Sequence, residues 1–479
     1  MHESPTSASR SLENPTPGPL SLISAAVREK VVSASEVLEA SLAALAASEL
    51  NATSELDVDA AREGARQLDE RGPSGALAGA PTLIKDLEDW RGHPTRKGSL
   101  ALATVAPAAQ NSVVTQRLLD SEAIVVGKST LPEFAIEGYT ASPLTGVTRN
   151  PWNLALSPGG SSGGSGSALA AGLVAIATET DGGGSVRIPA SLCGLVGLKP
   201  TNGVIGRWPA PDWIDYSTDG ILVTSADDLA LLARVLLGPV AGDPTAAPQL
   251  PESPGAPTVL IAARCTSPFG PLEADVERQL RRAVEALGDL FGVVPTWMDP
   301  SEFFLDGDPD LDWFVTTSAE HVASLGREWV ESHWDIFHVA TQEFLERGLA
   351  TTLDDYLAAR RRRYLYVRRL DELLGETGLL LTPSVAASGW PADGSTPSGE
   401  VHGLSPETLS TAVQNITGHP ALSVPFGTLE NALPFGIQLT APRYQDRWLI
   451  ELAARIESVL PWPRCAPGFA TLSARLGLE

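Results

Sequence analysis

The chain has 479 residues, of which 43% are hydrophobic and 19% are charged, so it carries enough apolar material for a large buried core. Its 34 basic and 58 acidic residues leave a formal net charge of −24, which argues against nucleic acid or an anionic membrane surface as a partner. Three scattered cysteines, Cys193, Cys265 and Cys465, do not make a disulfide framework and indicate a reducing compartment. No run of about 18 apolar residues occurs in the sequence. We therefore expect a cytoplasmic protein.

The beginning of the chain differs in character from the rest. Residues 1–18 are polar, rich in proline and serine, and without the apolar core of a secretory signal, so they predict a disordered leader. We expect residues 19–479 to form a single domain. Apolar residues recur every three or four positions over residues 20–50, which predicts helices. The apolar run that ends at Lys85 predicts a short buried strand over 82–85.

The middle of the chain alternates between the two kinds of element. Helices are predicted over 113–121 and after Gly163, and strands over 123–129 and 173–180. Ser225, followed three residues later by Asp228, is typical of a helix N-terminus, and that helix ends at Gly238.

A segment rich in proline, glycine and alanine, residues 239–257, is linker-like and separates this region from the last third of the chain. The patterns beyond it predict the following elements: a strand over 258–263, a helix from about 272, a largely helical region over 318–374, strands over 378–384, 421–427 and 434–440, and an amphipathic helix over 446–460. Strands that alternate with helices indicate a layered α/β fold with a largely parallel or mixed sheet.

Two neighbouring segments consist almost entirely of glycine and serine: SPGGSSGGSG (157–166) and the start of TDGGGSVRIPAS (180–191). Flexible linkers are disfavoured, because both segments are embedded in apolar elements. A phosphate-binding P-loop needs a lysine after its second glycine, and residues 129–198 contain none. A dinucleotide-binding turn also fits the spacing poorly.

Nucleophilic catalysis is the remaining interpretation of these segments. Consecutive glycine amides can approach a developing oxyanion without a Cβ in the way, and Ser185 follows them directly at the expected start of a short helix. None of the seven histidines lies in or beside the two segments, although a histidine distant in sequence could still reach them. Lys85 could act as the base if burial lowers its pKa. The alternative is a lysine at a strand end whose amine reaches the solvent.

Taken together, GAPTLIKD, SPGGSSGGSGSALAAG and TDGGGSVRIPASLCGLVGLKPT resemble the amidase signature family of serine hydrolases. Further similar stretches are TRNPWN (148–153), NITGHPALSVPFG (415–427) and LPFGIQLTAP (433–442). The resemblance extends from about residue 20 to residue 460. It implies an α/β fold with a large mixed central β-sheet flanked by helices on both faces.

The resemblance also implies a set of site residues. Ser185 is expected as the nucleophile, Ser161 as a bridging serine after a cis peptide from Gly160, and Lys85 as the base. The remaining expected members are the oxyanion-hole amides of Gly182, Gly183 and Gly184, a supporting hydroxyl on Ser162, and a bracing ion pair between Asp181 and Arg187. Members of the family more often carry threonine or isoleucine at the position of Gly182, so we expect glycine to loosen the loop and enlarge the pocket there.

The function implied is an amidase that hydrolyses a small or medium carboxamide, aryl or alkyl, or a carbamate, through an acyl-enzyme on Ser185. Alternatives are a nylon-type oligoamide or cyclic-dimer hydrolase and a urethanase; less favoured are the amidase-like component of a tRNA-dependent amidotransferase and a non-catalytic binding protein. No cofactor and no metal are implied. The expected partner is a small-molecule amide substrate, with no nucleic acid and no membrane, for a monomer or homodimer. We also expect the aromatic segments 207–216 and 297–314 to shape an apolar pocket mouth, unless they serve only in loop packing.

Overall fold

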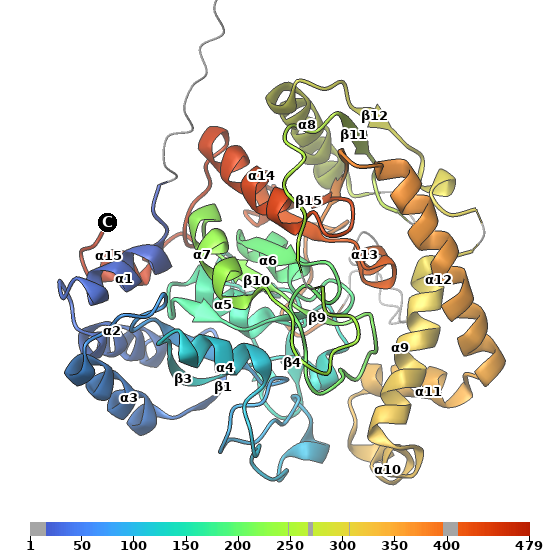
Figure 1. Ribbon diagram of the computed structural model, residues 1–479. Coiled ribbons are helices and arrows are strands. Elements are labelled where there is room, and N and C mark those ends of the chain that lie inside the picture. Colours follow the sequence, from blue (N-terminus) through green and yellow to red (C-terminus); the bar gives the residue numbers. More distant parts are fainter. Residues whose placement is uncertain (1–15, 248, 267–271, 306, 396–410) are drawn as a thin grey trace, which may run out of the picture.

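The computed structural model describes residues 16–247, 249–266, 272–305, 307–395 and 411–479 (Figure 1). Of the predicted leader, residues 1–15 lie outside this description, and the first helix begins at Pro19. In the described parts of the chain, no helix combines the length and apolarity needed to cross a membrane.

The largest sheet has seven strands and mixed direction. Its first four neighbouring pairs are antiparallel and its last two are parallel. In spatial order the strands are β10 (Ile221–Val223), β8 (Val196–Lys199), β14 (Ala421–Thr428), β15 (Pro434–Thr440), β13 (Gly378–Pro383), β11 (Val259–Ala262) and β12 (Thr296–Trp297).

Alternation along these strands gives the sheet two different faces. Leu381, Leu422 and Leu439 share one face, where they join the hydrophobic core built with α7 (Ala226–Leu236), α8 (Ala274–Phe291) and α14 (Asp446–Val459). The other face carries buried polar side chains such as Gln438, and α6 (Arg187–Cys193) packs closely against it. A Cβ on Gly436 would lie 2.7 Å from Ser191 of α6, so glycine permits this close approach. The prediction of a mixed sheet with helices on both faces is confirmed.

A second sheet of four strands positions the start of the site. Its order is β1 (Thr53–Leu56), β3 (Ile124–Ser129), β2 (Pro81–Lys85) and β6 (Ile176–Ala177). Strands β2, β3 and β6 are parallel, and β2 is buried along its whole length between its two neighbours. Lys85, the last residue of β2, is therefore placed at the carboxyl end of three parallel strands, where ligand sites commonly form.

Helices from both ends of the chain cover this second sheet. Helices α2 (Ala34–Ala46) and α3 (Val58–Arg71) pack on it, and α15 (Leu472–Arg475) contacts both α1 (Pro19–Arg28) and α2. Figure 1 shows the C-terminus beside α1 and α15, next to this helical group.

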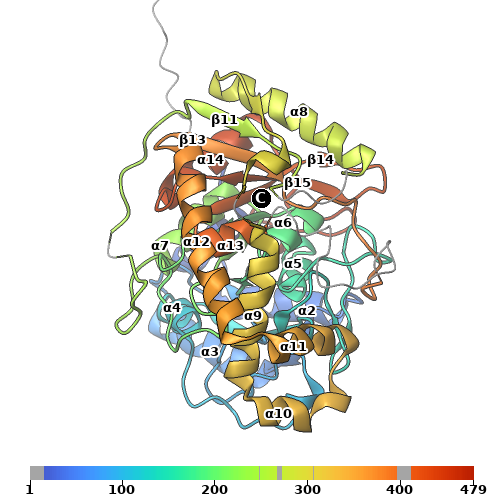
Figure 2. The same cartoon turned by 90° about the vertical axis from the view of Figure 1, so that its right-hand side faces the viewer.

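A separate group of helices lies along the other side of the molecule (Figures 1 and 2). It consists of α9 (Pro309–Leu325), α10 (Arg327–Ser332), α11 (Val339–Ala350) and α12 (Leu353–Leu374). The predicted helical region over 318–374 is thus several helices, broken first at Gly326, whose φ of 88° ends α9. In Figure 2, α12 and α9 run down the side that faces the viewer, and α11 and α10 lie at their lower end, below the seven-stranded sheet.

The remaining elements follow the predicted order with local differences. The strand predicted over 173–180 is two short strands, β6 and β7 (Thr180–Asp181), because the chain leaves β2 after Ala177 and pairs next with β9 (Thr218–Asp219). Ser225 caps α7 as predicted, accepting a hydrogen bond from the Asp228 amide at 3.1 Å. The other elements are β4 (Ala141–Ser142), β5 (Gly146–Val147), α4 (Val113–Asp120), α5 (Gly163–Ala170) and α13 (Ala412–Thr417).

Candidate active site

The amine of Lys85 is fully buried at the end of β2. Its Nζ lies 2.8 Å from Ser161 Oγ, 2.9 Å from Ser162 Oγ and 2.9 Å from Thr180 Oγ1. The alternative in which this side chain reaches the solvent is therefore wrong. A charge at this position would have to be supported by three neutral hydroxyl groups and by carboxylates farther away.

Burial lowers the pKa of Lys85 to about 7 from a usual value of 10.5. The negative charges of Glu88, Glu179 and Asp181 oppose this effect without cancelling it. A neutral amine has two N–H donors and one lone pair, which matches the three hydroxyl neighbours: two can accept and one can donate. The uncharged form can thus be fully hydrogen-bonded in this site.

The first glycine–serine segment holds its serines against Lys85 through close backbone packing. The peptide between Gly160 and Ser161 is cis, as the family resemblance implied. A Cβ on Gly160 would lie 2.4 Å from the Tyr139 carbonyl oxygen, and one on Gly164 would lie 2.4 Å from Thr130 Oγ1. Only glycine fits at these two contacts, so the absence of side chains reflects a tightly packed turn.

The second segment runs from β7 into α6 and lies beside the first. The Ser162 amide donates a hydrogen bond to the Ser185 carbonyl oxygen at 3.3 Å, which joins the two segments directly. Ser185 and Ser161 line the same cavity, together with Thr180 and Gly182. The structure therefore brings both predicted serines and the Lys85 hydroxyl partners to one place.

A buried ion pair braces the second segment. Arg187 Nη2 lies 2.7 Å from Asp181 Oδ1, and both side chains are fully buried. Burial raises the pKa of Asp181, but the charge of Arg187 more than offsets this and leaves it at about 2. Asn415 and Gln438 also accept hydrogen bonds from the guanidinium, at 2.7 Å each. This network ties the loop to α13 and to the polar face of the seven-stranded sheet.

The three consecutive glycine amides are not equivalent. The Gly184 amide donates to Asp181 Oδ1 at 2.8 Å, so this N–H already has an acceptor. The amides of Gly182 and Gly183 donate to no protein acceptor within the described ranges. An oxyanion hole in this conformation would therefore draw on Gly182 and Gly183, while Gly184 holds the loop in shape.

The space beside Gly182 is filled, contrary to the expectation of a loosened loop and an enlarged pocket. A Cβ at this position would lie 2.5 Å from Cε3 of Trp213. The indole thus occupies the volume that a side chain at position 182 would need. Glycine at position 182 leaves room for the Trp213 ring, which comes from another segment of the chain.

The cavity at the serines has a volume of about 430 Å³. One wall is apolar and includes Leu102, Phe134 and Leu325. Of the two aromatic segments expected at its mouth, residues 207–213 line it, with Trp208 55% exposed. None of the described residues of 297–314 lines it, so for that segment the expectation is wrong.

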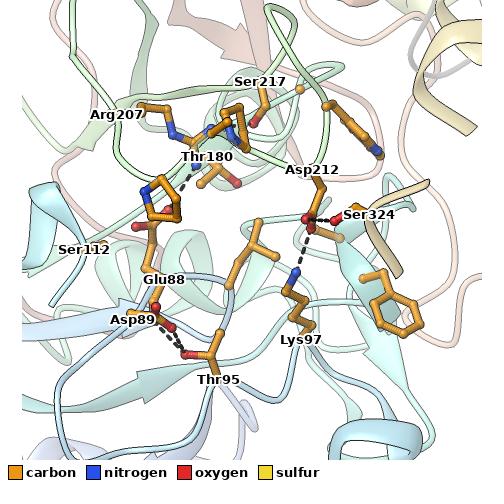
Figure 3. Close-up of a pocket in the computed structure, with 18 of the residues that line it drawn as sticks. Glu88, Asp89, Thr95, Lys97, Ser112, Thr180, Arg207, Asp212, Ser217 and Ser324 are labelled. Atoms are coloured by element: carbon orange, nitrogen blue, oxygen red, sulfur yellow. Dashed lines mark hydrogen bonds and ion pairs between the residues drawn. The ribbon is translucent and has the colours of Figure 1, made fainter. Parts of the chain in front are cut away.

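The lining of the cavity also includes charged groups (Figure 3). Lys97 Nζ and Ser324 Oγ each lie 2.6 Å from a carboxylate oxygen of Asp212, which joins three segments across the mouth. Arg207 lies 3.4 Å from both Glu88 and Asp219. Burial raises the pKa of Asp219 to about 8, although Arg207 opposes the shift.

A histidine base was left open by the sequence, and His321 does line the cavity. Its ring packs edge-to-face against Phe134, Trp213 and Phe344. Burial lowers its pKa to about 4. Neither ring nitrogen hydrogen-bonds to any residue of the described chain, serines included. Lys85 is thus the basic group in direct contact with the Ser161 hydroxyl.

Several residues of the site were missed from the sequence. Thr180 contacts the Lys85 amine, and its position directly before Asp181 in TDGGGS was the available signal. Trp313, Thr411 and Asn415 hold the glycine loop from segments more than a hundred residues away. Asn415 and Trp313 lie in stretches that the sequence singled out, but no local pattern gives them this role. Among the described residues, no group of three or more His, Cys, Asp or Glu side chains is arranged to hold a metal ion.

Comparisons with known proteins show extensive similarity along the chain. Residues 36–450 match the family model described as Amidase. The amidase AmiA2, so named in Mycobacterium tuberculosis, is 32% identical over 461 residues, which cover 91% of this chain and 92% of that protein. The 6-aminohexanoate-cyclic-dimer hydrolase of Paenarthrobacter ureafaciens is 31% identical, with 94% and 96% covered.

Solved structures show the same similarity in three dimensions. A bacterial aryl acylamidase of the amidase signature enzymes superposes with a TM-score of 0.83 at 26% identity, covering 92% of this chain and 96% of that one. A 6-aminohexanoate cyclic dimer hydrolase complexed with substrate gives a TM-score of 0.83 at 28% identity, with 94% and 98% covered.

Proposed function

Since the chain belongs to the amidase family and is an amide-hydrolysing enzyme, we propose that it cleaves a small or medium carboxamide through an acyl-enzyme on Ser185. The observation that carries this proposal is the contact between a fully buried Lys85 amine and Ser161 Oγ, at 2.8 Å. An amine with a pKa of about 7 is available as a base in about half of the molecules at neutral pH and in most of them slightly above it.

The reaction begins with proton transfer along the serines. The Ser185 hydroxyl attacks the substrate carbonyl carbon and gives its proton to Ser161, whose own proton passes to neutral Lys85. The substrate carbonyl oxygen takes up the negative charge and accepts hydrogen bonds from the glycine amides. Preorganised donors of this kind contribute several kcal/mol in comparable sites, about 2.7–4 kcal/mol for one donor.

Collapse of the tetrahedral intermediate completes the first half. The Lys85 ammonium returns a proton through Ser161 to the leaving nitrogen, the C–N bond breaks and the amine departs. Water then attacks the acyl-enzyme by the same relay and releases the carboxylic acid. Ser162 and Thr180 keep the amine oriented toward Ser161, since both hydroxyls lie 2.9 Å from Nζ.

The wall composition supports a substrate with an apolar part. Trp208, Phe134 and Leu102 offer apolar surface suited to an aryl or alkyl group. Cleavage of an oligoamide or cyclic dimer is a second candidate, because a relative with that name covers 94% of this chain. A carbamate has a carbonyl carbon that Ser185 could attack in the same way, so it is also a candidate substrate.

Replacing the proposed nucleophile tests the assignment. We expect Ser185→Ala to lose hydrolysis and to lose labelling by a fluorophosphonate, with Ser324→Ala as a matched serine at the cavity mouth that keeps both. Hydrolysis or labelling that survives in Ser185→Ala refutes the proposal. A panel of anilides, aliphatic amides, carbamates and 6-aminohexanoate oligomers then ranks the substrate classes.

A further inference from the structure

We propose that Trp313 is a positioning residue for the oxyanion hole, because its indole fixes the direction in which the Gly183 amide points. This inference rests on the proposed function, in which the Gly182 and Gly183 amides receive the oxyanion. It assigns a role to a residue of the 297–314 segment, of which no described residue lines the cavity.

The central contact is a hydrogen bond from Trp313 Nε1 to the Gly182 carbonyl oxygen at 2.7 Å. This carbonyl and the Gly183 N–H belong to the same peptide group. Because the peptide group is planar and the bond is trans, its C=O and N–H point in opposite directions. An indole that holds the oxygen on one side therefore aims the N–H at the other side.

Packing adds to this hydrogen bond. A Cβ on Gly183 would lie 2.7 Å from Cζ2 of Trp313, so the ring lies directly against the loop. Trp213, which fills the space beside Gly182, meets Trp313 edge-to-face with ring centroids 5.4 Å apart. The two indoles thus cover a stretch of backbone that has no side chains of its own to restrain it.

The next peptide group is restrained by a different residue. Thr411 Oγ1 donates to the Gly183 carbonyl oxygen at 2.7 Å, and the Gly184 amide of that same peptide group donates to Asp181. Both ends of this second peptide are therefore held by protein. In the first peptide, only the carbonyl end has a protein partner among the described residues, which leaves the Gly183 N–H available to a ligand.

Helix α9 keeps Trp313 in place through its neighbour Asp312. This carboxylate accepts hydrogen bonds from Tyr366 at 2.6 Å and from Arg362 Nε at 2.8 Å, both on α12. The indole is 7% exposed. The proposed role therefore depends on a helix pair outside both sheets.

Substitution of Trp313 by phenylalanine removes the N–H and keeps an aromatic ring. We expect kcat to fall about 10- to 100-fold, which is less than the loss of about 10²- to 10³-fold on removing an oxyanion donor, because the Gly183 N–H is misaligned and not removed. KM should change less than about twofold. Affinity for a trifluoromethyl ketone, to whose carbonyl Ser185 adds to form an oxyanion, should fall by the same factor. Amide binding to a Ser185→Ala background should not change with the Trp313 substitution. Trp329→Phe, on α10 away from the cavity, is the matched control.

A second variant protects the test against a folding defect. If Trp313→Phe does not fold, as judged by circular dichroism and thermal unfolding, Tyr366→Phe, which removes the hydrogen bond to Asp312 beside Trp313, should still lower kcat and ketone affinity together without raising KM. If the wild type is active and the folded variants keep its kcat, the inference is wrong and the proposed function stands. The same conclusion follows if the variants lose ground-state amide binding by the same factor as kcat. A wild-type chain that neither hydrolyses amides nor forms the ketone adduct refutes the proposed function and the inference with it.

Discussion

The pH dependence of hydrolysis is the sharpest consequence of the buried Lys85 amine. The proposed relay requires this amine to be uncharged before Ser185 attacks. Its pKa is lowered to about 7, so the protonated, inactive form takes over as the pH falls below that value. With one titrating group, about one-eleventh of the enzyme is active at about pH 6 and about ten-elevenths at about pH 8. We therefore expect kcat/KM to rise about tenfold over this interval and to level off above it.

Other groups that titrate near the site require a control. Burial raises the pKa of Asp219 to about 8, so this carboxyl also changes charge in or near the window. Burial also raises the pKa of Glu179 well above its usual range. Replacing the amine separates the contributions. In Lys85→Ala the general base is gone, and we expect kcat/KM at about pH 8 to fall about 10²- to 10⁴-fold, with the residual activity nearly independent of pH between about 6 and 8.

The assay is a series of initial rates on an anilide at low substrate concentration, where the rate reports the free enzyme. Wild type and Lys85→Ala are compared over the same buffers, and thermal unfolding at each pH shows that both remain folded. If kcat/KM of Lys85→Ala still rises with pH near pH 7, another group causes that rise. If Lys85→Ala keeps full activity, the amine takes no part in the reaction.

Three further predictions concern packing, the buried ion pair and the mouth. Gly182→Ala places a Cβ 2.5 Å from Trp213 Cε3, so we expect kcat to fall at least about tenfold. In the double variant Gly182→Ala/Trp213→Leu, where the indole is gone, kcat should recover in part. A double variant with no recovery of kcat would contradict the steric explanation. Arg187→Met leaves an unpaired buried carboxylate and should lower the free energy of unfolding in urea by about 3–5 kcal/mol, and the exposed Arg62→Met should lower it far less. Similar losses in the two variants would contradict that difference. Trp208→Ala should lower kcat/KM for anilides about 3- to 10-fold relative to short alkyl amides, and an unchanged ranking would place this ring outside the substrate pocket.

Local chemistry makes much of the site predictable from residue order. The run of glycines at 182–184, the serines at 161 and 185, and the lysine after an apolar run each carry a pattern within a few residues. The same holds for the principal strands β2, β13, β14 and β15, because a strand or helix depends on periodicity and end signals that neighbouring residues supply. The cap at Ser225 is predictable for this reason.

Residue order thus specifies the kind of chemistry and the residues that could perform it, since nucleophile, base and amide donors are properties of residue types in order. The folded arrangement sets which amides remain free, how far burial lowers the pKa of Lys85, and how Trp213 and Trp313 fill the space around the loop. These properties arise from contacts between segments distant along the chain, and no local pattern specifies such contacts. Burial and packing are sums over spatial neighbours, so they exist only once the chain has folded.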